Sequence, residues 1–157
     1  MSDEQLGHEK TLTALVPALA GASLIYGSGM TESGVTFDCA QLVIDDEIAA
    51  MILHVVGGFR VDDEALAVED IAAVGPFGDF LSLDATMRHM REQSMPKYLD
   101  RRVREDWKER GGSDLYERAK AAALEIIESH KPEPLDPDAA KQIRAIVEAA
   151  DRERGVA

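Results

Sequence analysis

Apolar positions in the first twenty residues recur at spacings of three and four, which is the pattern of an amphipathic helix. The apolar stripe consists of Leu12, Leu15, Val16 and Leu19. Ser2-Asp3-Glu4-Gln5 is typical of a capping box, in which the Ser2 hydroxyl accepts from the Gln5 amide and the Gln5 side chain reaches back. A first helix is therefore predicted from Ser2 until Gly21 ends the run.

The pattern changes after this helix. Residues 22–26 form a short apolar run between glycines, which is typical of a buried strand in a parallel sheet. From Phe37 to Val56 the period returns to that of a helix with a broad apolar face. Helix, strand and helix in this order make one slice of a (β/α) repeat, in which chemistry sits on the loop after the strand. That loop is residues 27–34.

A lone strand of the parallel type cannot satisfy its backbone donors and acceptors without neighbours. We therefore expect the missing strands to come from another chain, or from the rest of a larger α/β protein of which this polypeptide is the tail. The remaining elements are predicted to be helices, and at least half of the residues are expected to be helical. Their ranges are 62–74, 84–91, 100–110, 114–130 and 136–155.

Charge and cysteine content exclude several classes of function. The chain has 17 Lys and Arg against 30 Asp and Glu, a formal charge of −13, so nucleic acid and anionic membranes are expected to be repelled. Cys39 is the single cysteine, which excludes an internal disulfide, and we expect it to be a small buried residue rather than a reactive thiol. The apolar run 11–27 follows an acidic segment and is too short to span a bilayer. A cytoplasmic location is expected.

The loop after the predicted strand is the first candidate site. Its glycines allow positive φ and close approach of the backbone, while Tyr26 and Glu32 are placed to face a ligand cation through cation–π and Coulomb attraction. The alternative is a connecting loop with a solvated Glu32, and the residues alone leave both open. The loop matches no phosphate-binding motif.

Other clusters of polar residues are given structural interpretations. Asp45-Asp46-Glu47 cannot converge on one metal ion, since successive helix positions point about 100° apart, and a solvated edge is predicted. The four histidines have no zinc-type spacing. His89 with Arg88 and Arg91 is interpreted as ordinary surface charge.

Five ordered stretches of the chain resemble the C-terminal third of the trimethylamine methyltransferase family. They are EQLGHEKT (4–11), GASLIYGSGMTESG (21–34), QLVIDDEIA (41–49), VGPFGDFL (74–81) and HKPEPLD (130–136). The resemblance implies a helix-rich α/β fold, the C-terminal fragment of a TIM (β/α)8 barrel with a C-terminal helical extension. Residues 1–95 would be the last βα units of the barrel, and residues 96–157 the extension.

The resemblance also implies an activity. Members of this family transfer a methyl group from trimethylamine, or from a quaternary amine such as glycine betaine, to the Co(I) of a separate corrinoid protein. The cofactor is therefore a cobalamin carried by the partner, and none is expected to be bound directly. The archaeal trimethylamine enzymes use pyrrolysine, whereas many bacterial relatives lack it and demethylate quaternary amines such as glycine betaine. This sequence contains neither pyrrolysine nor the region where it would lie, and a non-pyrrolysine relative of the quaternary-amine type is expected.

The candidate substrate-binding residues under this resemblance are Tyr26, Gly27, Gly29 and Glu32, on a late barrel strand and its ligand-side loop. No catalytic residue and no metal ligand is assigned. Roughly the first two-thirds of the family's length has no counterpart here, so the fragment alone is expected to be inactive and to self-associate through exposed apolar surface. The alternatives are a non-catalytic helical module that binds another protein and an inactive paralogue.

Overall fold

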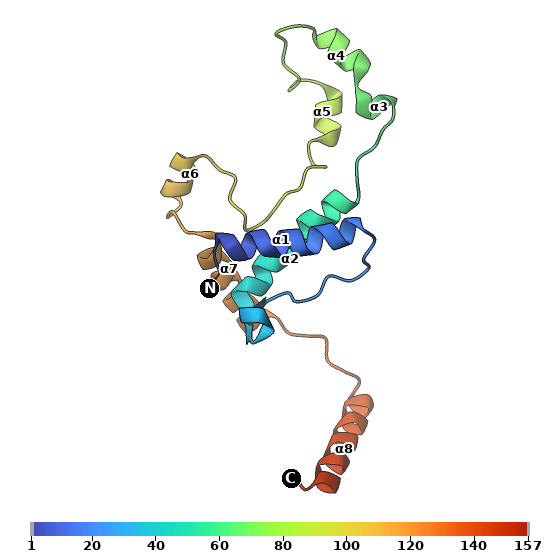
Figure 1. Cartoon of the computed structure of the whole chain (residues 1–157), viewed down its shortest axis with the longest axis vertical. Coiled ribbons are helices and arrows are strands. Elements are labelled where there is room, and N and C mark those ends of the chain that lie inside the picture. The colour runs from blue at the N-terminus through green and yellow to red at the C-terminus, as the bar shows by residue number, and fades with distance from the viewer. Residues whose placement is uncertain (1, 157) are drawn as a thin grey trace. The chain divides into compact units, whose positions relative to one another are not determined.

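The computed structural model describes residues 2–156, and more than half of these residues are helical, which confirms the prediction of a helix-rich chain (Figure 1). The chain divides into two compact units between Glu125 and Ile126. Each unit is described by itself. The boundary predicted between residues 95 and 96 separates the last barrel units from the C-terminal extension. The division into compact units does not test it, so it stays a prediction.

The first helix, α1 (Glu4–Leu19), begins one residue later than a Ser2 cap requires. Asp3 is the N-cap, and its carboxylate accepts from the Leu6 amide at 3.1 Å. The predicted capping box is therefore wrong. The Ser2 hydroxyl donates instead to the Gln41 side chain, because a carboxylate one position along competes for the free amides of the first turn.

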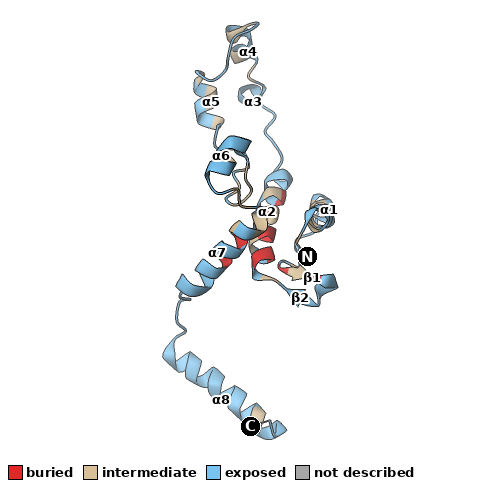
Figure 2. Ribbon diagram, turned by 90° about the vertical axis from the view of Figure 1, so that its left-hand side faces the viewer, coloured by how far each residue is buried: buried red, intermediate tan, exposed pale blue. Residues whose placement is uncertain are grey.

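Helix α2 (Cys39–Val56) forms the centre of the first unit and confirms the predicted helix, which starts at residue 39 rather than at 37. Its N-cap is Asp38, which accepts from the amides of Ala40 and Gln41. Buried residues gather where α2 and α7 (Leu115–Ser129) pack together (Figure 2). This small core consists of Ala40, Ile44 and Ala119, flanked by Val43, Ile48, Leu115 and Tyr116.

The prediction of a buried strand over residues 22–26 is wrong. The segment lies outside any helix or strand and runs from the end of α1 as the blue loop in Figure 1. Within residues 2–156 the sheet consists of β1 (Met30–Thr31) and β2 (Thr36–Phe37), an antiparallel pair around the 3-10 turn η1 (Glu32–Gly34). The physical reason is that the described chain offers no parallel strand to pair with residues 22–26.

The middle of the chain forms four short helices. The helix predicted over 62–74 is two, α3 (Asp63–Leu66) and α4 (Val68–Val74), because Ala67 between them has φ 48°. Leu83 stands at the N-cap position of α5 (Asp84–His89) and makes no side-chain hydrogen bond to the helix. Helix α6 (Arg104–Glu109) is shorter than the predicted range 100–110. Trp107 on this helix donates its indole N–H to the Ser113 carbonyl at 2.9 Å.

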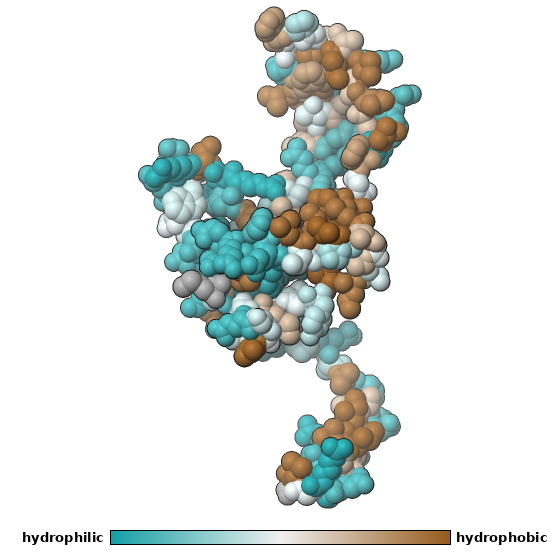
Figure 3. All heavy atoms as spheres, in the orientation of Figure 1, coloured by the Kyte–Doolittle hydropathy of each residue, from teal (hydrophilic) through white to brown (hydrophobic). Residues whose placement is uncertain are grey.

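Aspartate side chains cap the last two helices. Asp114 and Glu117 exchange hydrogen bonds between side chain and amide at the start of α7, a reciprocal capping box. In α8 (Pro137–Arg154), Asp136 accepts from two amides, and Gly155 ends the helix with φ 66°. One side of α8 exposes apolar residues to solvent (Figure 3). Within residues 2–156, no helix combines the length and apolarity that crossing a bilayer requires.

Candidate functional site

A hollow of about 360 Å³ lies between α1, α2 and the loop that follows α1. Helix α1 contributes Lys10, Thr13, Ala14 and Pro17, and α2 contributes Asp45, Ile48, Ala49 and Ile52. The loop closes the hollow with residues 24–28. Its walls are therefore mainly apolar, and its charged groups are one lysine and one aspartate.

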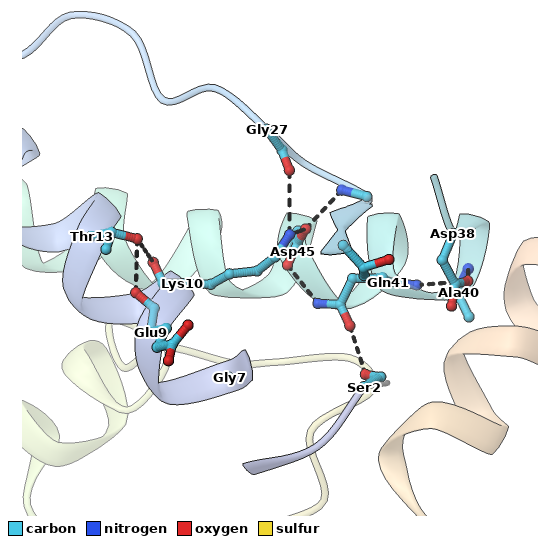
Figure 4. A network of polar contacts seen from close by, with 12 residues as sticks. Ser2, Gly7, Glu9, Lys10, Thr13, Gly27, Asp38, Ala40, Gln41 and Asp45 are labelled. Carbon is cyan, nitrogen blue, oxygen red and sulfur yellow. Dashed lines mark hydrogen bonds and ion pairs between the residues drawn. The ribbon is translucent and has the colours of Figure 1, made fainter. Parts of the chain in front are cut away.

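Asp45 organises the polar side of this hollow (Figure 4). Its carboxylate forms an ion pair with Lys10 and accepts from the Gly29 amide at 2.7 Å and from the Gln41 side-chain amide at 2.7 Å. The same Lys10 ammonium donates to the Gly27 carbonyl at 3.3 Å. Asp45 is 6% exposed, so these three donors replace its hydration. The ion pair therefore ties α1, α2 and the loop to one another.

Gln41 extends the network to the start of the chain. Its side-chain oxygen accepts from the Ser2 hydroxyl at 2.6 Å while its amide donates to Asp45, and the residue is only 1% exposed. Among the residues that the structure describes, no buried side-chain nitrogen or oxygen lacks a partner. A fully satisfied buried network of this kind holds one loop conformation.

Gly29 is the position where the loop requires a glycine. It has φ 76°, and a Cβ built there would lie 2.7 Å from the Phe37 ring and 3.2 Å from Leu42 Cβ. Both the backbone conformation and the close approach exclude a side chain. The glycine lets its amide point at Asp45 while β2 packs over it.

The four candidate residues occupy different places around the hollow. Tyr26 and Gly27 line it, and the Tyr26 side chain is accessible to a ligand because the residue is 82% exposed. Gly29 is held by Asp45. Glu32 is not among the lining residues, and its carboxylate accepts from the Thr36 hydroxyl at 2.7 Å. Their roles in binding substrate stay predictions.

The acidic run at 45–47 is the main correction to the sequence-based interpretation. Asp46 is exposed, but Asp45 and Glu47 are buried at 6% and 8% exposure, so a solvated edge is wrong. The spacing along the helix is the sequence signal for this burial. Asp45 lies one turn after Gln41, which is also buried, and shares a helix face with apolar Ile48 and Ile52.

Glu47 has its own partners on the other side of α2. Its carboxylate accepts from the backbone amides of Lys97, Tyr98 and Leu99, at 2.9 Å for the last two. Arg118 of α7 donates to the Tyr98 carbonyl at 3.0 Å, so the same segment is held from both directions. The sequence contains no motif for this contact, because fifty residues separate the carboxylate from the amides.

Asp38 and Tyr116 link the start of α2 to α7. The Tyr116 hydroxyl donates to Asp38 at 2.9 Å, and this hydrogen bond raises the pKa of Tyr116. Burial alone would raise the pKa of Asp38, but the hydrogen bonds from Tyr116 and from the Ala40 and Gln41 amides outweigh it and lower the pKa. The neighbouring Cys39 is exposed, which contradicts its predicted burial. The first turn of α2 presents it to solvent.

The basic spot at residues 88–91 is part of a surface ion-pair cluster. Both ring nitrogens of His89 lie near carboxylates, at 2.6 Å from Glu92 and 3.3 Å from Glu64, and these contacts raise the pKa of His89. Arg88 also approaches Glu64, at 3.6 Å. This agrees with ordinary surface charge. Within residues 2–156, no three His, Cys, Asp or Glu side chains are grouped so as to hold a metal ion.

Comparison with known proteins gives one consistent result. A family model described as trimethylamine methyltransferase (MTTB) matches residues 1–155. A trimethylamine methyltransferase of Desulfitobacterium hafniense is 50% identical over 155 residues, which are 99% of this chain and 31% of that relative. One from Methanosarcina barkeri is 44% identical over 150 residues, 96% of this chain and 30% of the relative.

A protein named for a second substrate is also similar. A glycine betaine methyltransferase of Desulfitobacterium hafniense is 30% identical over 156 residues, covering 98% of this chain and 32% of that relative. The chain thus spans a little under one third of the length of each of these relatives.

Proposed function

Because this chain belongs to the trimethylamine methyltransferase family, we propose that it forms part of an enzyme that demethylates trimethylamine or a quaternary amine such as glycine betaine. The observation that carries the proposal is the family match over residues 1–155 together with 50% identity to a trimethylamine methyltransferase. Relatives named for both substrates are similar to this chain, so the choice between the two amines is left to the experiment.

The proposed methyl acceptor is the Co(I) centre of a corrinoid carried by a separate protein. In such a transfer a Co(I) centre held by that protein would supply the electron pair for the new bond to the methyl group. The nitrogen of a protonated tertiary amine or of a quaternary amine keeps the pair of the broken N–CH3 bond and leaves as a neutral amine. No proton is removed from the transferred group, so the step needs no general base. What the protein must supply is a pocket that holds a methylated nitrogen and tolerates its positive charge.

The hollow beside α1 offers surroundings of this type. Tyr26 presents an aromatic face, and the Lys10–Asp45 pair leaves no uncompensated charge that would repel a cation. In the proposed enzyme Tyr26 and Gly27, which line the hollow, form part of the substrate wall. Gly29 and Glu32 lie outside the hollow on the same loop and are proposed to complete this wall in the whole enzyme. Asp45 acts behind them as a positioning residue, because it holds the Gly29 amide.

The proposed fold of the whole enzyme is a TIM barrel, with this chain as its closing part and its C-terminal helical extension. Support comes from residues 22–26, whose Leu24 and Tyr26 are 78% and 82% exposed. An apolar segment without sheet partners is what remains when the strands beside it belong to polypeptide outside this chain. We therefore propose that the chain alone has no turnover.

The experimental test adds the part of the relatives' length that this chain does not span. The part of the Desulfitobacterium hafniense relative that precedes the matched region is joined to this chain, and methylation of free Co(I) cobalamin is followed by its absorbance with trimethylamine and with glycine betaine. We expect amine-dependent methylation by the hybrid and none by the chain alone. A folded hybrid that is inactive with both amines, beside an active parent enzyme, would contradict the proposal.

Variants of the hybrid then address the substrate wall. Tyr26→Ala and Glu32→Gln are each expected to weaken amine affinity, and unchanged affinity in both would remove these residues from the site. An inactive hybrid that nevertheless forms a stable complex with the corrinoid protein would favour the alternative of a non-catalytic interaction module.

A further inference from the structure

A second hollow, of about 470 Å³, lies in the first unit around the segment 95–102 and collects positive charge in a chain whose formal charge is −13. Its charged lining residues are Lys97, Arg101, Arg102, Arg118 and Asp100. The other lining residues are Met95, Pro96, Tyr98 and Leu99. We call this hollow the cationic basin. It is separate from the hollow beside α1, with which it shares no lining residue.

Two guanidinium groups of the cationic basin are oriented by main-chain carbonyls. Arg118 donates from Nε to the Tyr98 carbonyl at 3.0 Å and from Nη1 to the Ser113 carbonyl. Arg101 donates from Nη1 to the Ser94 carbonyl at 2.6 Å. A carbonyl fixes the direction of a guanidinium without neutralising it. Each arginine has five N–H donors, so both retain donors for a ligand.

Acidic groups compensate only part of this charge. Asp100 is paired with Arg102 through two contacts of 2.7 and 2.9 Å, and hydrogen bonding to that guanidinium lowers the pKa of Asp100 to about 2. Four cations and one carboxylate leave an excess of three positive charges in the lining. Carboxylates outside the lining offset two of the cations, since Glu47 and Glu125 act on Lys97 and Asp106 acts on Arg102. The hydrogen bonds of Arg101 and Arg118 go instead to uncharged oxygens.

We propose that the cationic basin is a binding site for a phosphate-class oxyanion carried by a small organic molecule. The two guanidinium groups bound to uncharged oxygens, those of Arg101 and Arg118, match the two charges of a dianion. Guanidinium groups oriented in this way are suited to bidentate contact with phosphate oxygens. The volume lies within the range of small-molecule sites, and Met95, Pro96 and Leu99 offer apolar contact to the body of the ligand. The proposal does not depend on the proposed function.

The experiment titrates the complete 157-residue chain with inorganic phosphate at constant ionic strength, against sodium chloride as reference, and follows backbone amides by NMR. We expect saturable shifts at the amides of residues 97–102 that chloride does not produce. The informative variant is Arg101→Gln, because Arg101 is exposed and its contact is to a single carbonyl. We expect it to weaken phosphate binding at least fivefold.

Two further variants separate a site from a general charge effect. Arg144→Gln removes the same charge from exposed α8 and is expected to change the affinity less than twofold. Arg118→Lys keeps the charge but removes the planar fork, and it is expected to weaken binding while circular dichroism shows an intact fold. Equal shifts in phosphate and chloride, or an equal loss of affinity in Arg101→Gln and Arg144→Gln, would overturn the proposal.

Discussion

Replacing Asp45 by alanine is expected to destabilise the first unit by about 3 kcal/mol. Breaking a buried ion pair by removing one partner typically costs about 3–5 kcal/mol, because it leaves an uncompensated charge. The Asp45 side chain is 7% exposed, but that of Lys10 is 19% exposed and can regain some water, which favours the lower end of that range. The Gly29 amide and the Gln41 side chain also lose an acceptor.

The assay is urea unfolding of the 157-residue chain followed by circular dichroism, with amide exchange at Gly29 as a local probe. Asp46→Ala, at the exposed neighbouring position on the same helix, serves as the control and is expected to change stability by less than about 0.5 kcal/mol. Lys10→Met combined with Asp45→Ala is expected to recover part of the loss, since it removes the unpaired charge. Equal midpoints for Asp45→Ala and Asp46→Ala, with unchanged exchange at Gly29, would refute the reasoning.

Four other outcomes are expected. Gly29→Ala forces a Cβ to 2.7 Å from a packed ring at φ 76° and should destabilise the loop by about 1–3 kcal/mol, visible as faster amide exchange in residues 27–38. Glu47→Gln replaces a charged acceptor by a neutral one and should increase exchange at the amides of residues 97–99, with unchanged exchange contradicting that contact. NMR titration of His89 should give a pKa above 6.5, and this pKa should fall in Glu92→Gln. Because the pKa of His89 is higher in the folded state than in the unfolded state, its ion pairs stabilise the fold fully below pH 6.5 and are lost as the pH rises through the folded-state pKa. The exposed apolar surface predicts concentration-dependent self-association in gel filtration, and a monomer at all concentrations would contradict it.

The elements that could be predicted from the sequence are those whose signals are local. The cap, the first turn and the end of α8 are set by residues within or beside the helix, namely Asp136, Pro137 and Gly155. They can therefore be predicted from the local sequence. Residues 22–26 show the limit of such reasoning. Their apolar run indicates a strand, but a strand exists only through hydrogen bonds to another segment, and the described chain provides none.

The candidate site also contains residues that could be predicted from the sequence and residues that could not. Tyr26 and Gly27 could be proposed from the sequence because glycines mark the loop. Lys10 and Asp45 could not, since the burial of a carboxylate depends on a partner 35 positions away in the chain. A charged residue on a helix that has no such partner is usually exposed to solvent, and for this reason the sequence favours a solvated helix edge at residues 45–47.

The geometry that argues against a metal site at residues 45–47 also explains what the run does. Side chains two positions apart on a helix point about 200° from each other, so Asp45 and Glu47 lie on opposite sides of α2, while Asp46 is exposed to solvent. Asp45 holds the loop that closes the hollow beside α1, and Glu47 holds the segment that lines the cationic basin. Both contacts place a buried carboxylate on main-chain amides, which fixes backbone rather than side chains. Helix α2 is therefore the rigid element to which the surroundings of both hollows are attached, and substitutions at residues 45 and 47 should perturb them independently.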